Sequence, residues 1–373
     1  MSVAYFAHEL ADPAVQKRLK MLAAGGCEVE LLGFERRRFS GDAPEQRRHV
    51  LGRTQSGKLF SRIFSVLLAL PRAWRVRHIW ADAEVLLARN LEMLVVVVFL
   101  ARLLKLKARI VYECLDLHRL MLAPSHAGRL LRMIERACLK RVSLVITSSP
   151  AFDTYYFRAM QQYAGELLVV ENKVLALDDA DAAPPRTPAG PPWRIAWCGV
   201  LRCKTSLDIL TAAAAQLGEQ IEIELWGVPS LDQIPDFHAR VAQCPRMRFN
   251  GRYKPENLGD IYARAHFVWA IDFYEAGGNS DWLLPNRLYE GLRFGAAPIA
   301  AAGVETARWV EARNAGIVLA EPLADSLAAF IAELTPERYA ALSAPIAALD
   351  PEAVAFSPAS CRGLAARLAG AEA

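Results

Sequence analysis

The chain has 373 residues, of which 53% are hydrophobic and 23% are charged. This length favours two domains, and this composition excludes a disordered chain because it supplies apolar side chains for large cores. The net charge of +4 is unevenly spread: residues 1–182 carry +8 and the remainder carries −4. The basic first half favours an anionic partner there, which could be a membrane surface, a phosphate-bearing substrate or nucleic acid, although an ordinary solvated surface would have the same composition.

Three further features concern the compartment. The seven cysteines are scattered without a CxxC pair, which suits a reducing cytosol better than a disulfide framework. The amino end, MSVAYFAHEL, lacks the basic-then-apolar order of a signal peptide. The longest apolar run, residues 93–101, is far shorter than the roughly 20 residues that a membrane span needs, so we predict a buried helix segment.

The first half alternates short apolar strands with amphipathic helices. The pattern predicts helices at 13–24, 90–106 and 128–142 and strands at 2–7, 27–34, 84–89, 109–114 and 144–149. Strands that alternate with helices imply right-handed crossovers and a parallel sheet.

Two segments between the second and third of these strands need separate treatment. GRTQSGKL, residues 52–59, approaches the phosphate-loop pattern GxxxxGK[ST], but Leu59 replaces the hydroxyl residue and no apolar strand precedes it, so we do not predict ATP hydrolysis. Residues 58–78 have apolar side chains at helical spacing, with basic and aromatic side chains beside them. Such a helix can lie on an anionic bilayer, or it can simply face the core with its basic flanks in solvent.

The stretch ALDDADAAPPRTPAGPPW contains five prolines and cannot form regular structure, so residues 176–192 are predicted to link two domains, 1–175 and 193–355. We expect its aspartates, Asp178, Asp179 and Asp181, to be solvated linker charges rather than metal ligands. The second domain repeats the pattern, with helices at 207–217 and 258–265 and strands at 193–199, 221–227, 247–251, 266–271 and 316–321. The segment 356–373 holds a last helix, at about 360–368, that could pack on either domain. We therefore predict an α/β protein of two Rossmann-like, doubly wound parallel-sheet domains facing across a cleft that holds the ligand.

The stretch LPNRLYEGLRFGAAPIAAAG, residues 284–303, follows a predicted strand and a loop with two glycines. Pro285 is suited to open a helix, whose free N–H groups at Asn286 and beyond would form an anion site. Arg287 can add a charge-assisted contact, and Glu290 can accept hydrogen bonds from two adjacent hydroxyls, as a ribose offers. The alternative is a surface helix with an ordinary Arg–Glu pair at spacing three.

A second corner of the same predicted sheet is GVLRCKTSLDIL. Gly199 stands at the turn, and Arg202 and Lys204 lie just before the following helix. Two cations at this position would neutralise a diphosphate. The alternative is that both are ordinary surface cations in contact with solvent.

Taken in order, several motifs resemble the GT-B glycosyltransferases, close to glycosyltransferase family four and most specifically to bacterial exopolysaccharide enzymes of the succinoglycan type. The motifs cover nearly the whole chain: AYFAHELADPAVQKRLKMLAAGGCEVELLGF, YECLDLHRLML, IERACLKRVSLVITSSPAF, GVLRCKTSLDIL, MRFNGRYKPENLGDIYARAHFVWAI and LPNRLYEGLRFGAAPIA.

The resemblance implies roles for several residues. Glu290 would hold the ribose of a nucleotide-sugar donor, Arg202 and Lys204 its diphosphate, and Gly251 to Tyr253 would line the base pocket. No metal and no bound cofactor are expected, because the helix end and the two cations would stabilise the leaving diphosphate.

Two positions depart from the family pattern. Trp282 stands where many members have a second glutamate, eight positions before the ribose glutamate. Glu275 and Asp281 are nearby substitutes, but neither has the expected spacing. Leu115 stands where a histidine would follow the cleft-facing strand of the first domain.

Four further polar residues of the first domain are predicted to lie at the mouth of the cleft. Asp116 and His118 could contact the sugar or supply a general base, or could be a helix cap and a loop histidine. His8 and Glu9, after the first strand, could contact the acceptor or merely close a turn.

We therefore expect a glycosyltransferase that moves a sugar from a nucleotide diphosphate donor, UDP-linked by preference, to a lipid-linked oligosaccharide. It would be cytoplasmic and peripheral on the inner face of the plasma membrane, with an anionic membrane surface and no nucleic acid among its partners. The absence of an obvious strong base favours retention of anomeric configuration. A nucleotide-sugar epimerase of the same architecture and a non-catalytic scaffold of the polysaccharide machinery are the alternatives.

Overall fold

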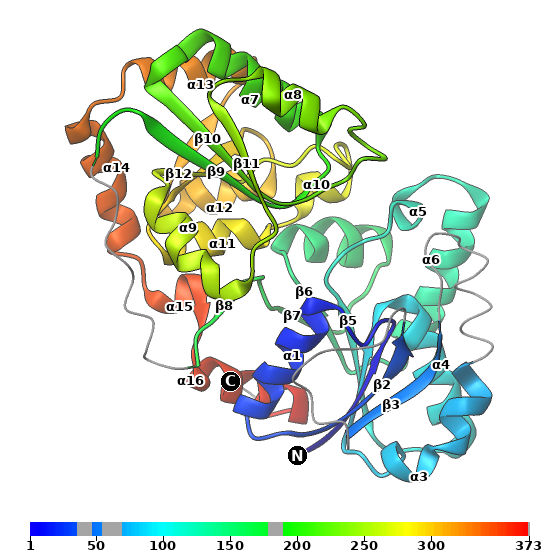
Figure 1. Ribbon diagram of the computed structural model, residues 1–373. Helices are drawn as coiled ribbons and strands as arrows, with labels where there is room; N and C mark the ends of the chain where they lie inside the picture. Colours follow the sequence, from blue (N-terminus) through cyan, green and yellow to red (C-terminus); the bar gives the residue numbers. More distant parts are fainter. Residues whose placement is uncertain (36–46, 54–68, 178–188, 372–373) are drawn as a thin grey trace. The chain divides into compact units, whose positions relative to one another are not determined.

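A computed structural model describes residues 1–35, 47–53, 69–177 and 189–371. The chain divides into two compact units (Figure 1): unit 1 comprises Met1–Glu171 and Phe356–Ala373, and unit 2 comprises Asn172–Ala355. Most of the segment 58–78, the sequence GRTQSGKL beyond Arg53, and residues 178–188 of the predicted linker lie outside the described residues.

Unit 1 is built on a seven-stranded parallel sheet with the order β3-β2-β1-β4-β5-β6-β7. The chain winds outward from β1 in one direction and from β4 in the other, so the strand order reverses between these two neighbours. The strands are β1 (Ser2–Ala7), β2 (Glu28–Glu35), β3 (Arg48–Arg53), β4 (Val85–Arg89), β5 (Arg109–Cys114), β6 (Leu144–Thr147) and β7 (Glu166–Val169).

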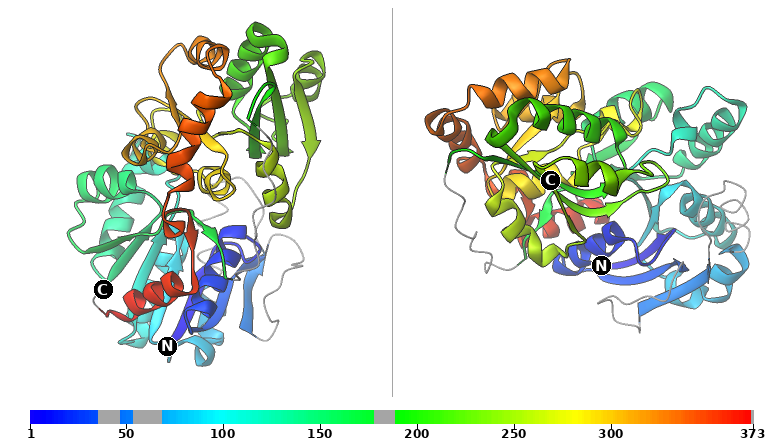
Figure 2. Two further views of the ribbon diagram at one scale, coloured as in Figure 1. Left: turned by 90° about the vertical axis from the view of Figure 1, so that its left-hand side faces the viewer. Right: turned by 45° about the horizontal axis from the view of Figure 1, so that its top comes forward.

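The helices of unit 1 include one from the end of the chain. Asp12 caps α1, because its side chain accepts a hydrogen bond of 2.8 Å from the Ala14 N–H. The terminal helix α16 packs against α1 (Figures 1 and 2), and a Cβ on Gly25 would lie 2.6 Å from the Cys361 carbonyl oxygen. The terminal helix thus belongs to the first unit. The helices are α1 (Pro13–Ala24), α3 (Arg77–Trp80), α4 (Asn90–Leu104), α5 (Arg119–Leu122), α6 (His126–Leu139), the π-helix η2 (Phe152–Met160) and α16 (Pro358–Ala369).

Unit 2 repeats this plan with a six-stranded parallel sheet in the order β11-β10-β9-β12-β13-β14, reversing between β9 and β12. Three fully buried tryptophans, Trp193, Trp197 and Trp269, lie in its core. The strands are β9 (Trp193–Leu201), β10 (Ile221–Pro229), β11 (Met247–Gly251), β12 (Phe267–Trp269), β13 (Ala297–Ala301) and β14 (Ile317–Leu319). The main helices are α7 (Lys204–Leu217), α8 (Phe237–Gln243), α9 (Leu258–Arg264), α10 (Asn279–Trp282), α11 (Asn286–Arg293), α12 (Glu305–Arg313), α13 (Leu323–Ala332), α14 (Pro336–Ala347) and α15 (Pro351–Val354). The predicted pair of doubly wound parallel sheets is confirmed.

Several elements differ from the sequence prediction. Strand β3 was not predicted because RHVLGR is basic and contains a glycine, and β7 was not predicted because it has only four residues. Helix α7 begins at Lys204 rather than at residue 207, and Pro285 is the N-cap of α11 rather than its first residue. The first difference places the amino terminus of α7 closer to the end of β9 than expected, whereas α11 begins one residue later than expected.

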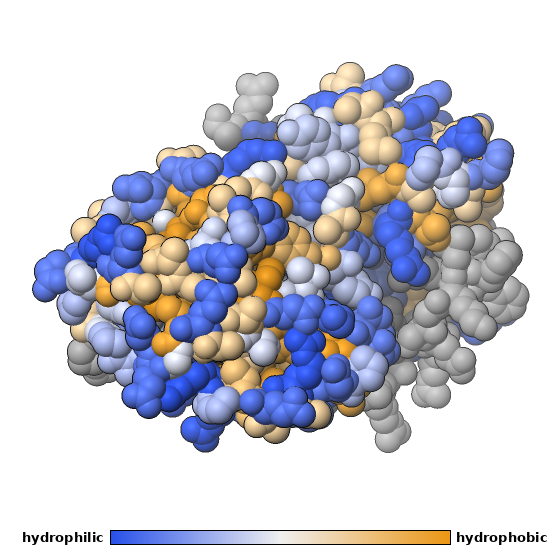
Figure 3. Space-filling view, turned by 90° about the horizontal axis from the view of Figure 1, so that it is seen from above, coloured by the Kyte–Doolittle hydropathy of each residue, from blue (hydrophilic) through white to orange (hydrophobic). Residues whose placement is uncertain are grey.

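The apolar run 93–101 lies within α4, where most of its side chains are buried, although Phe99 is exposed. Within the described ranges, no helix combines the length and the hydropathy that a bilayer span requires. All seven cysteines lie in the described part of the chain as free thiols. On the face seen in Figure 3, apolar residues are interspersed with hydrophilic ones.

A buried charge cluster connects four elements of unit 1, namely β1, α1, β4 and β5. Glu113 on β5 is fully buried and accepts hydrogen bonds from Arg18 Nε at 2.6 Å, Tyr5 Oη at 2.6 Å and Arg89 Nη1 at 3.0 Å. Burial alone would raise the pKa of this carboxyl, but Arg18 and Arg89 outweigh it and lower the pKa to about 2. The ionised carboxylate therefore stabilises the folded state.

We expect Glu113→Gln to reduce the free energy of unfolding by about 3–5 kcal/mol at neutral pH, because it leaves two buried guanidinium groups without their counter-charge. The folded pKa lies below the ordinary value of 4.5, so this contribution is present above pH 4.5 and disappears as pH falls toward 2. Urea unfolding of both proteins between pH 7 and pH 3 should show a gap that narrows in acid. Glu219→Gln, at a 92% exposed carboxylate paired with Arg246, is the control and should cost less than about 0.5 kcal/mol. A gap that is constant with pH would contradict the assignment.

Candidate functional site

The candidate site of unit 2 lies where its strand order reverses. Strands β9 and β12 are parallel neighbours, with Ile195 opposite Phe267, so the segments that follow them begin at the same edge of the sheet. In open α/β sheets this is the position where ligands bind. A small hollow lies at this edge and is lined by Asp272, Ser280 and Thr306 among others.

The corner after β9 depends on two glycines that face each other in register. Gly199 lies opposite Gly227 of β10, and both have positive φ, 118° and 131°. A Cβ on Gly227 would lie only 1.8 Å from the Gly199 carbonyl oxygen. The close approach of the two strands therefore requires glycine at 227. Gly199 lies inside β9, which continues to Leu201, rather than at the turn as predicted.

Both cations of this corner have acidic partners, and Lys204 is the first residue of α7 rather than a residue before the helix. The Arg202 guanidinium lies over the Tyr274 ring, 4.3 Å from its centroid, and 3.8 Å from Asp272 Oδ2. Lys204 Nζ lies 3.1 Å from Asp208 Oδ2, one turn along α7. Both cations and Asp208 are 39–65% exposed, whereas Asp272 is only 11% exposed.

Cys203 joins this corner to the segment after β12. Its buried Sγ caps α7 by accepting from the Ser206 N–H at 3.3 Å, and it also accepts from the Phe273 N–H at 3.3 Å. One thiol therefore holds the corner with Arg202 beside the loop with Tyr274.

Helix α11, which begins at the asparagine of the LPNRLYEG motif, packs closely on β12. A Cβ on Gly291 would lie 2.4 Å from Val268 Cγ1, so the absence of a side chain brings the helix onto the strand. Asn286 is the exposed first residue of the helix. Arg287 Nη2 donates to the Ile271 carbonyl at 2.7 Å, and its buried Nε has no hydrogen-bond partner among the described residues. Arg287 thus holds the segment that follows β12, and its Nε–H is a buried donor without a hydrogen bond to the described residues.

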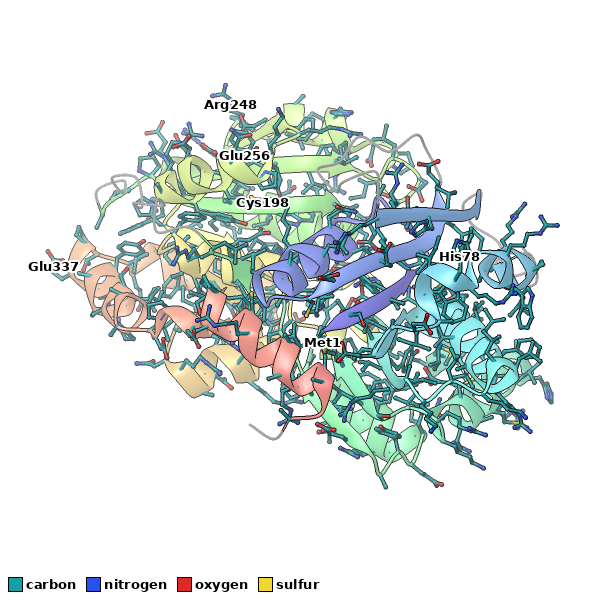
Figure 4. All side chains as sticks on the ribbon, turned by 90° about the horizontal axis from the view of Figure 1, so that it is seen from below. Met1, His78, Cys198, Arg248, Glu256 and Glu337 are labelled. Carbon is teal, nitrogen blue, oxygen red and sulfur yellow. The ribbon has the colours of Figure 1, made fainter. Side chains whose placement is uncertain are left out.

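Glu290 is half-buried and lies beside Tyr262, Cys198 and Tyr253. Tyr262 Oη donates to Glu290 Oε2 over a long distance of 3.4 Å. Burial, with the Glu290 carboxylate adding to it, raises the pKa of Tyr253 above its ordinary value, and burial raises the pKa of the Cys198 thiol to about 12. Cys198, labelled in Figure 4, belongs to β9, and Tyr253 packs against the cluster that contains it. The structure therefore brings the expected ribose carboxylate and the expected base-pocket residues Gly251–Tyr253 to one place.

Glu275 and Trp282, the two positions of the family departure, lie in the loop before α10 and at the last residue of α10. The Glu275 N–H donates to Ser280 Oγ at 2.9 Å, and the Gly277 N–H donates to Asp281 at 3.1 Å. Glu275 is half-buried in this loop, whose backbone these contacts fix.

His8 and Asn90 occupy the equivalent reversal point of unit 1, after β1 and β4. His8 Nδ1 lies 3.1 Å from Asn90 Nδ2, and His8 Nε2 lies 3.8 Å from Asp12 Oδ2. Asn90 has a φ of 67°, the left-handed region. Glu9 follows in the same turn, where its backbone carbonyl accepts from the Asp12 N–H at 3.4 Å.

Asp116 and His118 follow β5 at the carboxyl edge of the same sheet, and both are exposed. His118 is the N-cap of α5, and its Nδ1 accepts from the Leu120 N–H at 3.3 Å. An Nδ1 acceptor places the ring proton of neutral histidine on Nε2, so His118 can donate to a substrate without disturbing the cap. Leu115, at the position of the missing histidine, is buried.

Four residues of these sites were not predicted from the sequence: Asp272, Tyr274, Tyr262 and Asn90. Asp272 and Asn90 follow directly on predicted strands, so their place at the carboxyl edge was a usable signal. Tyr262 lies on α9 and Tyr274 in an irregular loop, and no local pattern indicates their contacts with Glu290 and Arg202.

Comparisons with known proteins agree with this arrangement. A model of the Glycosyl transferase 4-like domain matches residues 12–173. Among solved structures, sucrose-phosphate synthase from Thermosynechococcus elongatus superimposes with a TM-score of 0.72 at 17% identity, over 99% of this chain and 98% of the other. Anabaena HepE, in complex with UDP and glucose, gives a TM-score of 0.68 at 16% identity over the full length of both chains. The predicted GT-B fold is thereby confirmed, and the protein is a glycosyltransferase.

The family follows from a curated relative. The succinoglycan biosynthesis protein ExoL of Rhizobium meliloti (strain 1021) is 41% identical over 380 residues, covering 99% of this chain and 93% of that protein. The chain belongs to the same family.

We expect Gly227→Ala to lower the free energy of unfolding by about 2–4 kcal/mol, because the new Cβ would overlap the Gly199 carbonyl and φ is unfavourable for alanine. Gly363→Ala is the control: its Cβ meets nothing within 4 Å inside α16, so it should be neutral or should stabilise by up to about 1 kcal/mol. Chemical denaturation measures both. Equal stability of the two variants would show that the β9–β10 approach is not constrained as described.

Proposed function

We propose that the protein transfers a sugar from a uridine diphosphate donor and that unit 2 binds this donor. The observation that carries the proposal is the convergence of Glu290 with Tyr253 beside a corner that presents Arg202 and Lys204. A carboxylate can accept from both ribose hydroxyls, an aromatic ring can stack on a base, and two cations match a diphosphate. The preference for uridine rests on the structural likeness to HepE, which was solved with UDP and with UDP-glucose.

The leaving diphosphate is stabilised by protein groups, without a metal ion. The described part of the chain contains no cluster of three or more His, Cys, Asp or Glu side chains suited to hold one. The proposal is supported by groups that can stabilise the diphosphate in place of a metal ion. They are Arg202, Lys204 and the amino end of α7, where free N–H groups favour negative charge.

The acceptor we propose is a lipid-linked oligosaccharide in exopolysaccharide synthesis, at the inner face of the plasma membrane. Support comes from the name of the 41% identical relative, a succinoglycan biosynthesis protein, and from the net charge of +8 on residues 1–182. His8, Glu9, Asp116 and His118 at the carboxyl edge of unit 1 are the groups available to an acceptor hydroxyl.

The transfer retains anomeric configuration in this proposal. Support comes from His118, whose Nδ1 accepts the hydrogen bond from the Leu120 N–H that caps α5. This nitrogen is therefore not available as a general base, which an inverting transfer would need. Proton NMR of the first product would show the configuration directly.

A thermal-shift panel tests donor choice: UDP, GDP, ADP and their sugars are added to the protein. A ligand at 100 times its Kd stabilises the folded state by about 2.7 kcal/mol. We expect UDP compounds to give the largest shift, and no shift from any nucleotide would refute the proposed function. Incubating a stabilising UDP-sugar without acceptor then separates transfer from epimerisation, because only an epimerase converts the donor alone.

Glu290→Ala should lower kcat/KM at least tenfold, because each charge-assisted hydrogen bond to the ribose contributes about 1.5–3 kcal/mol. The matched control is Tyr262→Phe, which removes the 3.4 Å contact to Glu290 but leaves the carboxylate and should change kcat/KM by less than about threefold. If both variants lose activity equally, Glu290 acts through packing rather than through the ribose. Unchanged kinetics in folded Glu290→Ala would exclude the ribose role.

Arg202→Ala and Lys204→Ala should weaken UDP binding by about tenfold each while leaving uridine binding unchanged, because only the diphosphate meets these cations. Isothermal titration with both ligands makes the comparison. Transfer should continue in excess EDTA. Activity that requires added Mg²⁺ or Mn²⁺, or an equal loss for UDP and uridine, would contradict the metal-free diphosphate site.

A further inference from the structure

Helix α6 of unit 1 exposes three large apolar side chains and buries its carboxylate, although Cys138 and Leu139 near its end are buried. Leu130, Met133 and Ile134 are 57%, 63% and 37% exposed, whereas Glu135 is only 1% exposed. An amphipathic helix of a globular domain normally has the opposite orientation, with the apolar stripe against the core. The spacing of three and four residues places these three side chains on one stripe of the helix.

The buried side of α6 is fixed by hydrogen bonds, so the orientation is not easily reversed. Glu135 accepts from Tyr112 Oη at 2.7 Å, and also from Tyr156 Oη and Gln161 Nε2. Arg132 Nη1 donates to the carbonyls of Met121 at 2.6 Å and Ala123 at 3.0 Å, which ties α6 to α5. Turning the apolar stripe inward would break all of these contacts.

Helix α4 adds to the same side of unit 1. It packs against α6, and Phe99 and Leu103, one turn apart, are 52% and 54% exposed. Both helices are crossovers between successive parallel strands, β4 to β5 and β5 to β6, so they cover the same face of the sheet. We call the set Phe99, Leu103, Leu130, Met133 and Ile134 the α4–α6 apolar surface.

The charges beside this surface are almost all positive. Exposed cations on and directly after the two helices are Arg102, Lys105, Lys107, Arg129, Arg136, Lys140 and Arg141. The two helices contain two carboxylates, Glu135, which is buried, and Glu92, in the first turn of α4. Exposed apolar side chains with a basic surround match an anionic phospholipid surface, where apolar groups enter the acyl boundary and cations meet the headgroups.

We propose that the α4–α6 apolar surface docks on an anionic phospholipid bilayer. Helix α5, which His118 caps, contacts α6, so docking would bring the sheet edge with Asp116 and His118 close to the membrane. The role of docking in bringing this sheet edge to a lipid-linked acceptor rests on the proposed function. The docking itself is argued from the side chains of α4 and α6.

The test is co-sedimentation of the full chain with vesicles of phosphatidylcholine containing about 30% phosphatidylglycerol, with pure phosphatidylcholine vesicles for comparison. We expect binding to the anionic vesicles that weakens with salt, and a decrease of about tenfold in the double variant L130S/M133S. Arg129→Glu should weaken binding to the anionic vesicles alone. The matched control is Leu231→Ser in unit 2, where the side chain is 49% exposed and binding should not change.

Three outcomes would overturn the proposal: no binding to anionic vesicles, equal binding by L130S/M133S and the control, or a self-associated protein that the double variant converts to monomer without affecting vesicle binding. The last outcome would assign the surface to a second copy of the chain. The UDP thermal shift is measured on the same samples. A normal shift without vesicle binding refutes only the docking surface, and vesicle binding without any nucleotide shift refutes only the proposed donor function.

Discussion

Parallel pairing at the two points of strand reversal decides where the functional groups of this protein can lie. Between β1 and β4, and between β9 and β12, neighbouring strands end at one edge while their connections leave in opposite directions. The chain cannot cover the edge there, and polar residues that follow the strands gather around it. His8 and Asn90 in unit 1, and Arg202 and Asp272 in unit 2, meet for this reason although they are 82 and 70 residues apart in sequence.

The two units use charge differently at these edges. In unit 1 the guanidinium groups of Arg18 and Arg89 are almost completely buried and bind Glu113, so separating them would expose uncompensated charge in a low dielectric. In unit 2 the pairs of Arg202 with Asp272 and of Lys204 with Asp208 are partly exposed, and such pairs contribute only about 0–1 kcal/mol. In the proposed function, a diphosphate would replace these carboxylates as the partner of the two cations. The buried pairs of unit 1 stabilise its sheet.

Most of the fold could be predicted because its strands are apolar runs that end in turn residues. Strands at 2–7, 109–114 and 193–199, and the helix at 13–24, lie where the periodicity placed them, with the ninth strand extending to Leu201. Strand β3 and the π-helix η2 could not be predicted, since RHVLGR owes its conformation to pairing with β2 and FDTYYFRAM has no distinctive period. Of the candidate site, the two cations followed from their position after a strand, and Glu290 followed from the helix motif that contains it. The Tyr274 ring over Arg202 and the Cys203 thiol between two loops are tertiary contacts, which sequence spacing does not encode.

Helix α6 shows where hydrophobic periodicity alone gives the wrong orientation. Its stripe of Leu130, Met133 and Ile134 is the one that amphipathicity would turn toward the sheet, yet Glu135 is the residue that faces inward. Three hydrogen-bond donors compensate the desolvation of that carboxyl, and burial still raises its pKa above the ordinary value. Since the network around Glu135 satisfies the interior, the apolar stripe does not contribute to the core of unit 1. Exposed apolar groups of this size gain free energy only when something else covers them, and the proposed docking on a bilayer would cover those of α6 while hydrogen bonds hold the helix in place.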